Sequence, residues 1–402
     1  MTERRKRALR FVVLVGVMSL FADFTYEGAR GIAGPFLAAL GASGAVVGIA
    51  SGLGEFLGYT LRVVSGRLAD KTRQFWPITI AGYVVQMCAV PLLALAGNWP
   101  LAVGLLILER IGKATRNPPR DVMLSHAGKE MGGYGWAFGL HEALDQFGAL
   151  LGPLAMAGIL ALRHDYRLAF AVLAIPAAIT LALLVVARVL YPRPEDLEPS
   201  HEAEPLEGKG LPRRFWIYLA GAGLVAAGFA DYPLIAYHFE KAKILPGSMT
   251  AVFYAVAMGV SGAGSLVFGK LFDRFGLWIL VPLTLLTATY APFAFFGGTW
   301  VALIGTALWG LGMGVHESIV AAAVATMVPA SHRGSAYGIF TAGYGTFWLL
   351  GSALLGWLYD VSLVWVVLAA VILEIAAIPF IAVTARSREK MRSEGSGDAQ
   401  GQ

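Results

Sequence analysis

Residues 66–71 read Gly-Arg-Leu-Ala-Asp-Lys, and residues 269–274 read Gly-Lys-Leu-Phe-Asp-Arg. These two copies of one charged motif each follow a long apolar run, and the second begins 203 residues after the first. Two more pairs of segments match at similar separations: Phe-Ala-Asp-Phe at 21–24 with Phe-Ala-Asp-Tyr at 229–232, and Gly-Trp-Ala-Phe-Gly at 135–139 with Gly-Ser-Ala-Tyr-Gly at 334–338. Three matches in register predict a chain built from two related halves.

The segments around these motifs are strongly apolar. Of the 402 residues, 57% are hydrophobic and 14% are charged, whereas about a quarter of a soluble domain is charged. Of the 31 basic and 26 acidic residues, 24 lie in three short stretches, 1–10, 188–214 and 385–402. A membrane-spanning helix needs roughly 20 apolar residues, and runs of that length exclude the ~10-residue strands of a membrane β-barrel. We predict twelve membrane-spanning helices, at residues 10–39, 44–68, 76–97, 100–122, 134–161, 166–190, 214–239, 248–271, 277–297, 299–327, 335–358 and 362–384.

The basic residues predict the orientation of these helices. Twelve spans place both termini on one side, where 23 of the 31 Lys and Arg residues fall, Arg116 and Arg120 among them, and four fall in the opposite loops. Because basic loops stay in the cytoplasm, we expect a multi-pass protein of the cytoplasmic (inner) membrane with cytoplasmic termini. The predicted domains are an N-terminal six-helix bundle (1–190), a polar, Pro-rich cytoplasmic linker (191–213), a C-terminal six-helix bundle (214–384) and a cytoplasmic tail (385–402).

The motif at residues 66–71 resembles the first signature of the Major Facilitator Superfamily, and the resemblance extends over nearly the whole chain. After Lys71 the first copy departs from the signature, whereas the second keeps the expected Gly at position 276. The resemblance implies an all-α membrane protein with two pseudo-symmetric six-helix bundles. It also implies a secondary transporter that works by alternating access. The residues implied to latch the cytoplasmic helix ends in one state are Gly66, Asp70, Lys71, Arg73, Gly269, Asp273 and Arg274.

The fifth predicted span carries a second resemblance. It is similar to the antiporter signature of the same family, although Met156 and Ala157 stand where that signature has a Gly pair. Small residues let helices approach closely and Pro bends them, so ordinary close packing is an alternative interpretation. The residues expected to serve this packing are Gly139, Gly148, Gly152 and Pro153.

Ionisable residues inside the predicted spans are the main functional signal, because burying a charge in lipid is costly. Apart from charges counted with the ends of the spans, nine acids and four bases lie there, the acids being Asp23, Glu27, Glu55, Glu109, Glu142, Asp145, Asp231, Glu317 and Glu374. Asp23, Glu27 and Arg30 are spaced i, i+4, i+7 and so share one face of a helix. Structural ion pairing is the alternative role, above all for Arg62, Lys113 and Arg116. The excess of acids predicts proton coupling, for which the candidates are Asp23, Glu27, Glu109, Arg110, His141, Glu142 and Asp145.

A second group of residues is predicted to bind solute. Aromatic side chains near a few acids suit an amphipathic or cationic compound, although Tyr344 and Trp348 are equally suited to helix packing. The candidates are Tyr26, Arg30, Glu55, Asp231, Tyr232, Tyr237, His316, Glu317, Tyr344 and Trp348.

The preferred function is a proton-coupled antiporter that exports a small amphipathic or cationic compound. Proton-linked uptake of an organic anion or a sugar stays open, since Arg30 and Arg110 can hold an anion. Metal export through His141, Glu142 and Asp145 is a weaker alternative. An embedded enzyme or sensor is disfavoured because no nucleotide-binding or hydrolase motif occurs. The expected partners are a small solute, protons and the lipid bilayer. We expect no nucleic acid, cofactor or metal, and a functional monomer.

Overall fold

The structure is a computed structural model that describes residues 3–130, 134–193, 211–315, 323–324, 327 and 333–398. For some residues in these ranges, Asp70, Glu142 and Asp273 among them, only the backbone is described. The first half comprises α1 (Glu3–Ala39), α2 (Gly44–Thr72), α3 (Phe75–Leu92), the 3-10 turn η1 (Leu93–Leu95), α4 (Trp99–Glu130), α5 (Tyr134–Arg163), α6 (Tyr166–Val172) and α7 (Ala174–Leu190). The second comprises α8 (Arg213–Gly228), α9 (Tyr232–Lys241), α10 (Gly247–Phe275), η3 (Gly276–Ile279), α11 (Leu280–Thr287), α12 (Tyr290–Phe296), α13 (Thr299–Val315), α15 (Arg333–Val361) and α16 (Leu363–Asp398).

The described helices confirm the predicted all-α arrangement. Each predicted span coincides with one helix or with two or three consecutive helical segments, and the tenth is described without a gap as far as Val315. Nine segments of the described chain are long and apolar enough to cross a membrane, and α13 is a shorter apolar helix. Large apolar side chains such as Leu162 and Trp300 are more than three-quarters exposed, which suits a surface that faces lipid.

One predicted boundary is wrong. The fourth predicted span ends at residue 122, just after Pro118 and Pro119, but α4 runs through both prolines and continues to Glu130. Consecutive prolines cost a helix backbone hydrogen bonds without necessarily ending it, because neighbouring helices can support the bend. As a result, Arg116 and Arg120 lie inside the bundle, where both are buried, instead of at its rim.

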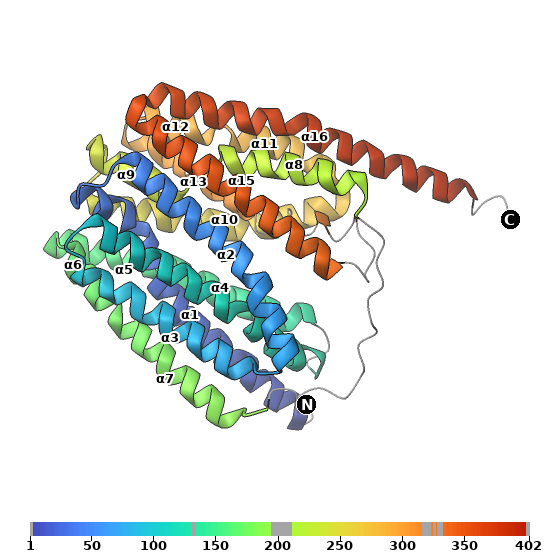
Figure 1. The fold of residues 1–402 in the computed structure, drawn as a ribbon, viewed down its shortest axis with the longest axis horizontal. Coiled ribbons are helices and arrows are strands. Elements are labelled where there is room, and N and C mark those ends of the chain that lie inside the picture. Colours follow the sequence, from blue (N-terminus) through green and yellow to red (C-terminus); the bar gives the residue numbers. More distant parts are fainter. Residues whose placement is uncertain are drawn as a thin grey trace.

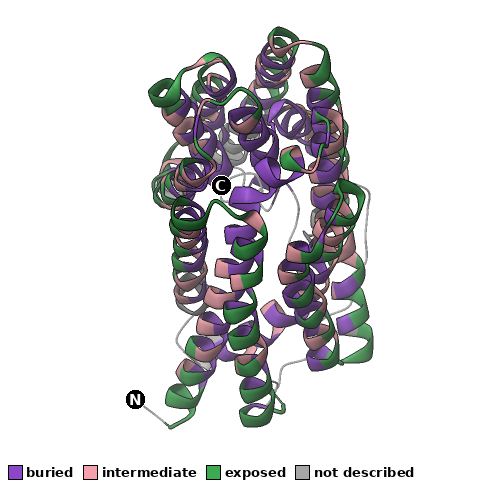
Figure 2. Ribbon diagram, turned by 90° about the vertical axis from the view of Figure 1, so that its left-hand side faces the viewer, coloured by how far each residue is buried: buried purple, intermediate pink, exposed green. Residues whose placement is uncertain are grey.

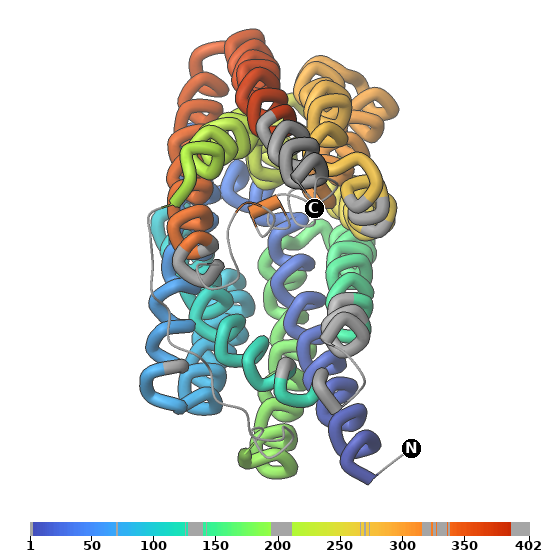
Figure 3. Tube along the Cα trace, turned by 90° about the vertical axis from the view of Figure 1, so that its right-hand side faces the viewer, coloured from blue at the N-terminus to red at the C-terminus, as the bar shows by residue number. Residues whose placement is uncertain are grey.

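The two halves lie side by side, with helices running along the length of the molecule (Figure 1). The start of α1 and the end of α16 lie at the same end, which Figure 3 views directly. Between the halves, α2 packs against α15, α5 against α10, and α1 against α9. Buried residues concentrate on the inward-facing sides of the helices (Figure 2).

The end remote from the termini is closed by contacts between the halves. Asp360, near the end of α15, accepts hydrogen bonds from the backbone N–H groups of Gly44 and Ala45, each at 2.8 Å. The Tyr237 hydroxyl donates to the carbonyl oxygen of Ala42 at 2.8 Å. Because a carboxylate at a helix N-terminus is stabilised by the helix dipole, the Asp360 contact fastens α2 to α15 at this end.

Removing this carboxylate is expected to open the closed end. Asp360→Ala removes two charge-assisted hydrogen bonds, each worth about 1.5–3 kcal/mol, so the population that is open at this end should rise about tenfold or more. Double electron–electron resonance between spin labels at the exposed residues Ala39 and Val361 measures that population. Asp165→Ala is the matched control, since Asp165 caps α6 within one half. An unchanged distance distribution in Asp360→Ala would contradict this role.

Glycines set the spacing between α5 and α1. A Cβ at Gly148 would collide with the carbonyl oxygen of Leu20, and one at Gly152 with that of Phe24. Pro153 lies inside α5, and its side chain would contact a Cβ at Gly31. Gly139 belongs to α5, but its surroundings lie outside what the structure describes. The geometry therefore supports the packing role predicted for Gly148, Gly152 and Pro153.

We expect Gly148→Ala to destabilise the protein by about 1–3 kcal/mol, because the added methyl group would force two helix backbones apart. The matched control is Gly158→Ala in the same helix, where a Cβ meets no atom within 4 Å. Thermal unfolding of the purified protein in detergent compares the two. Equal midpoints for both variants would mean that α1 and α5 are not held at this distance.

Candidate functional site

A cavity of about 760 Å³ lies between the halves, on the side of the molecule nearer the termini. Its small, neutral wall belongs to α10 and includes Gly259, Ser261, Gly262 and Ser265. Its charged lining comes from the first half: Asp23, Glu27, Arg62, Lys113, Arg116, Arg120 and Asp145. The cavity therefore combines charged and uncharged surfaces from different halves.

Asp23, Glu27 and Arg30, which we call the α1 stripe, lie along one side of α1 as their spacing predicts. Asp23 lies 3.4 Å from a guanidinium nitrogen of Arg116 in the same half. The other two reach the second half: Glu27 accepts a hydrogen bond from the Tyr254 hydroxyl, and Arg30 pairs with Asp231 at 2.9 Å. The α1 stripe thus joins charges of the first half to side chains of the second.

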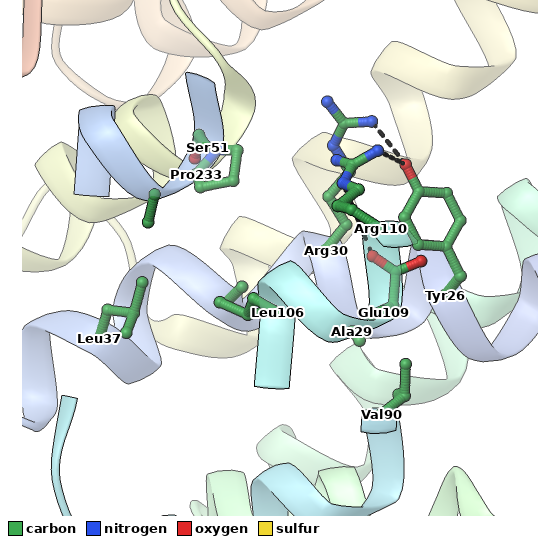
Figure 4. A pocket seen from close by; sticks show the side chains of 12 residues that line it. Tyr26, Ala29, Arg30, Leu37, Ser51, Val90, Leu106, Glu109, Arg110 and Pro233 are labelled. Carbon is green, nitrogen blue, oxygen red and sulfur yellow. Dashed lines mark hydrogen bonds and ion pairs between the residues drawn. The ribbon is translucent and has the colours of Figure 1, made fainter. Parts of the chain in front are cut away.

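Arg30 and Arg110 converge on shared partners beside the α1 stripe. Their Nη1 atoms donate to the Tyr26 hydroxyl at 2.8 and 2.6 Å, as Figure 4 shows. Their Nη2 atoms lie 3.1 and 3.0 Å from the same oxygen of Glu55. A second cavity, of about 40 Å³, is lined in part by Tyr26, Arg30, Glu109 and Arg110. Sequence reasoning selected all five residues but could not assign their contacts.

A buried network inside the first half includes residues that sequence reasoning missed. Gln86 of α3 donates to Glu109 at 2.8 Å and accepts from Nε of Arg116 at 2.6 Å. Arg116, which is fully buried, also donates to the Tyr83 hydroxyl at 2.8 Å. The sequence contains a pattern that could have identified these residues. Tyr83 and Gln86 are polar groups three residues apart in an apolar span and so share a helix face.

His141 and Asp145 lie together, as predicted, with 3.5 Å between Nδ1 and a carboxylate oxygen. The other ring nitrogen of His141 lies 2.9 Å from the hydroxyl of Ser19, which also accepts from Arg120 at 3.1 Å. The side chain of Glu142 lies outside the described part of the structure. In the part that is described, no group of three or more potential metal-ligating residues occurs.

The predicted excess of buried acids is smaller than the sequence count indicated. Arg116 and Arg120, which we assigned to the cytoplasmic face, are buried and add two bases to the interior. Glu374 is fully buried inside the second half, where it accepts a hydrogen bond from Thr287 at 3.3 Å. Most of the described interior acids thus pair with bases, whereas Glu374 contacts a neutral hydroxyl group.

The second half contributes fewer solute-site candidates than expected. Asp231 precedes α9 and accepts from Nε1 of Trp348 at 3.0 Å. Tyr232 donates to the carbonyl of Thr250, and Tyr344 packs on Tyr59. None of these aromatic side chains lines either described cavity.

The remaining candidates are scattered. Tyr237 lies at the closed end and lines neither described cavity, so its predicted place in the solute site does not match the geometry. His316 and Glu317 lie outside the described residues.

The predicted latch residues lie at the end nearer the termini. Lys71 and Arg73 are exposed, and Arg73 adopts a left-handed backbone conformation, with φ of 56°, where α2 ends. A Cβ at Gly66 would be in ordinary contact with Pro118 of α4. In the second copy Arg274 is exposed, with its guanidinium 5.2 Å from the centre of the Phe275 ring. The side chain of Asp70, like Gly269 and Asp273, lies outside what is described, so the latch stays a prediction.

Comparisons with known proteins show to which family the chain belongs. The chain is 43% identical over 376 residues to an uncharacterised protein of Mycobacterium tuberculosis, with 92% of each chain covered. It is 24% identical over 370 residues to an uncharacterised MFS-type transporter of Methanocaldococcus jannaschii, with 90% of this chain and 91% of that protein covered.

Solved structures share the fold at low sequence identity. A peptide transporter, POT, superposes with a TM-score of 0.74 at 13% identity, covering 97% of this chain and 99% of that one. A bacterial homologue of the human lysosomal transporter Spinster gives 0.70 at 15% identity, covering 96% and 98%. The sequence profile of the Major Facilitator Superfamily matches residues 15–323 and 232–401. The chain therefore belongs to the Major Facilitator Superfamily, whose fold is that of a multi-pass membrane transporter.

Proposed function

We propose that this protein is a proton-coupled antiporter that exports a small amphipathic solute. One observation carries the proposal: Glu27 lines the large cavity and also accepts a hydrogen bond from Tyr254 of the other half. A proton that reaches Glu27 through the cavity therefore acts on a contact between the halves. If the basic loops place the termini in the cytoplasm, the cavity faces the cytoplasm, where a solute for export is loaded.

Protonation changes the strength of this contact. A hydrogen bond to a carboxylate contributes about 1.5–3 kcal/mol, whereas one between neutral groups contributes about 0.5–1.5 kcal/mol. Protonated Glu27 thus holds Tyr254 less tightly, which favours separation of the halves where α1 meets α10. Asp231 offers a second such site, because a proton there removes the charge that pairs with Arg30. In this proposal Arg30 and Arg110 compensate the charge of Glu55 while Glu27 and Asp231 gain and lose protons.

The other proton-coupling candidates lie in or near the cavity that gives access to Glu27. Asp23 and Asp145 line the cavity, and His141 lies beside Asp145. Glu109 connects to Arg116 through Gln86. We propose that they relay protons or hold the arginines in place. The proposed latch at Lys71 and Arg73 forms when the cavity closes and the ends of the two halves approach.

Proton-linked uptake of an organic anion is the second candidate. The convergence of Arg30 and Arg110 on one tyrosine and one carboxylate favours it, because paired guanidinium groups bind oxyanions well. The two functions differ in whether the solute moves against the protons or together with them. An antiporter accumulates its solute in vesicles with an acidic interior, and a symporter accumulates it in vesicles with an alkaline interior.

Proteoliposomes with an imposed pH gradient test both candidates. The vesicles receive a mixed library of metabolites and drug-like compounds, and mass spectrometry measures which compounds accumulate beyond the level in protein-free vesicles. We expect accumulation in the acidic interior. Glu27→Gln should abolish gradient-driven accumulation, because an amide cannot carry the proton. It should preserve exchange of an isotope-labelled compound across the membrane without a gradient.

The matched control is Glu374→Gln, which neutralises a buried carboxylate that lines neither described cavity and should leave the accumulation intact. Accumulation that ignores the pH gradient in the unmodified protein would refute proton coupling. Gradient-driven accumulation that survives in Glu27→Gln would refute the role of this residue. Accumulation in the alkaline interior would establish the symport alternative instead.

A further inference from the structure

We propose that the large cavity binds an organic anion, whose negatively charged group is held by Lys113 and Arg62. This inference rests on the proposed transport function of the cavity and names the chemical class of its solute. It replaces the cationic solute that the count of acids in the sequence favoured.

Two of the four cavity cations already have carboxylate partners. Arg116 lies 3.4 Å from Asp23, and Arg120 lies 2.9 Å from Asp121. These ion pairs satisfy much of the hydrogen-bonding capacity of both guanidinium groups, and Arg116 also donates to Tyr83. A solute would have to displace these partners before it could bind either arginine.

Lys113 and Arg62 are different, because each lies on an aromatic ring. The ammonium nitrogen of Lys113 is 3.7 Å from the centre of the Tyr26 ring, and the Arg62 guanidinium is 5.8 Å from that of Tyr59. The acids Glu55 and Glu109 form their ion pairs with other arginines and attract these two cations from beyond ion-pair distance. A ring holds a cation by its face but accepts none of its N–H groups in the ordinary way. These two side chains therefore present positive charge and donors to the cavity.

The acids of the cavity have partners of their own. Asp23 pairs with Arg116, Asp145 lies beside His141, and Glu27 accepts from Tyr254. A cationic solute would have to compete for these carboxylates, whereas an anionic group meets donors that no described carboxylate occupies. Local pairing, and not the number of acids, thus decides which charge the cavity accepts.

The rest of the cavity indicates the body of the solute. Phe147, Leu150 and Met258 contribute apolar surface, and the small residues of α10 leave room opposite the cations. Pockets of 300–1,000 Å³ enclose organic molecules of drug or metabolite size, and this one measures about 760 Å³. The geometry points to an amphipathic organic acid, with a carboxylate, phosphate or sulfonate at one end.

Charged thiol reagents measure the potential in this cavity without knowledge of the solute. Gly259→Cys places a thiol in the lining, where a Cβ meets no atom within 4 Å, in a chain whose single cysteine is removed by Cys88→Ser. Anionic methanethiosulfonate ethylsulfonate and cationic methanethiosulfonate ethyltrimethylammonium are then compared, and their rates are normalised to free cysteine. We expect the anionic reagent to react faster. Lys113→Met should lower this preference about fivefold, as expected for a unit charge some 8 Å away in water.

Control variants keep the test decisive. Lys113→Arg retains the charge and should retain the preference, while Arg62→Gln should lower it independently. Lys241→Met is the matched control, because Lys241 also lies over a tyrosine ring but at the closed end. A faster reaction of the cationic reagent in the parent chain would overturn the proposal. So would a preference that Lys113→Met and Arg62→Gln both leave unchanged.

Protection by matched amphipaths extends the test to binding. Excess 2-naphthoate should slow modification of the cysteine introduced by Gly259→Cys. The concentration that it needs should be at least fivefold lower than that needed by 2-naphthylmethylamine or 2-naphthalenemethanol. Lys113→Met should erase this difference. Stronger protection by the amine or the alcohol would overturn the proposal. Both measurements are made without a pH gradient. They can therefore fail while proton-driven accumulation persists, and succeed where proton coupling is absent.

Discussion

The ion pair between Arg30 of α1 and Asp231 before α9 is the contact on which the central site depends. Both side chains are buried, and they come from different halves of the molecule. An unpartnered charge in such a place costs several kcal/mol, so each half supplies the charge that the other requires. The remaining contacts of Arg30, with Tyr26 and Glu55, bring Arg110 of α4 into the same group. A change of charge at this point therefore reaches both halves at once.

The two halves repeat one fold but differ in chemistry. The first half supplies the charged lining of the large cavity, whereas the second contributes the neutral wall of α10 and the anchoring side chains Tyr254, Asp231 and Trp348. This division suits a carrier in which one half holds the charge of the solute and the other moves against it. The closed end, fastened by Asp360, and the cavity at the opposite end describe one state of such a movement.

Much of this arrangement could be predicted from the sequence. Apolar run lengths gave the spans, and the i, i+4, i+7 spacing gave the α1 stripe, because both depend on local geometry alone. The partners of the stripe could not be predicted, since Asp231 lies 201 residues from Arg30 in the chain. The same limit hid Gln86, whose role depends on two residues of a neighbouring helix. The end of α4 could not be predicted either, because contacts with neighbouring helices, which a local rule on proline ignores, support the helix past Pro118.

The central claim is that protonation of buried carboxylates controls how the two halves meet. The most direct measurement is the distance distribution between spin labels at Leu68 and Phe275, which are half-exposed residues on α2 and α10, recorded at pH 5.5 and pH 8 without solute. Our account predicts that the populations of short and long distances shift with pH, and that Glu27→Gln reduces the shift. Identical distributions at the two pH values in the unmodified protein would contradict it.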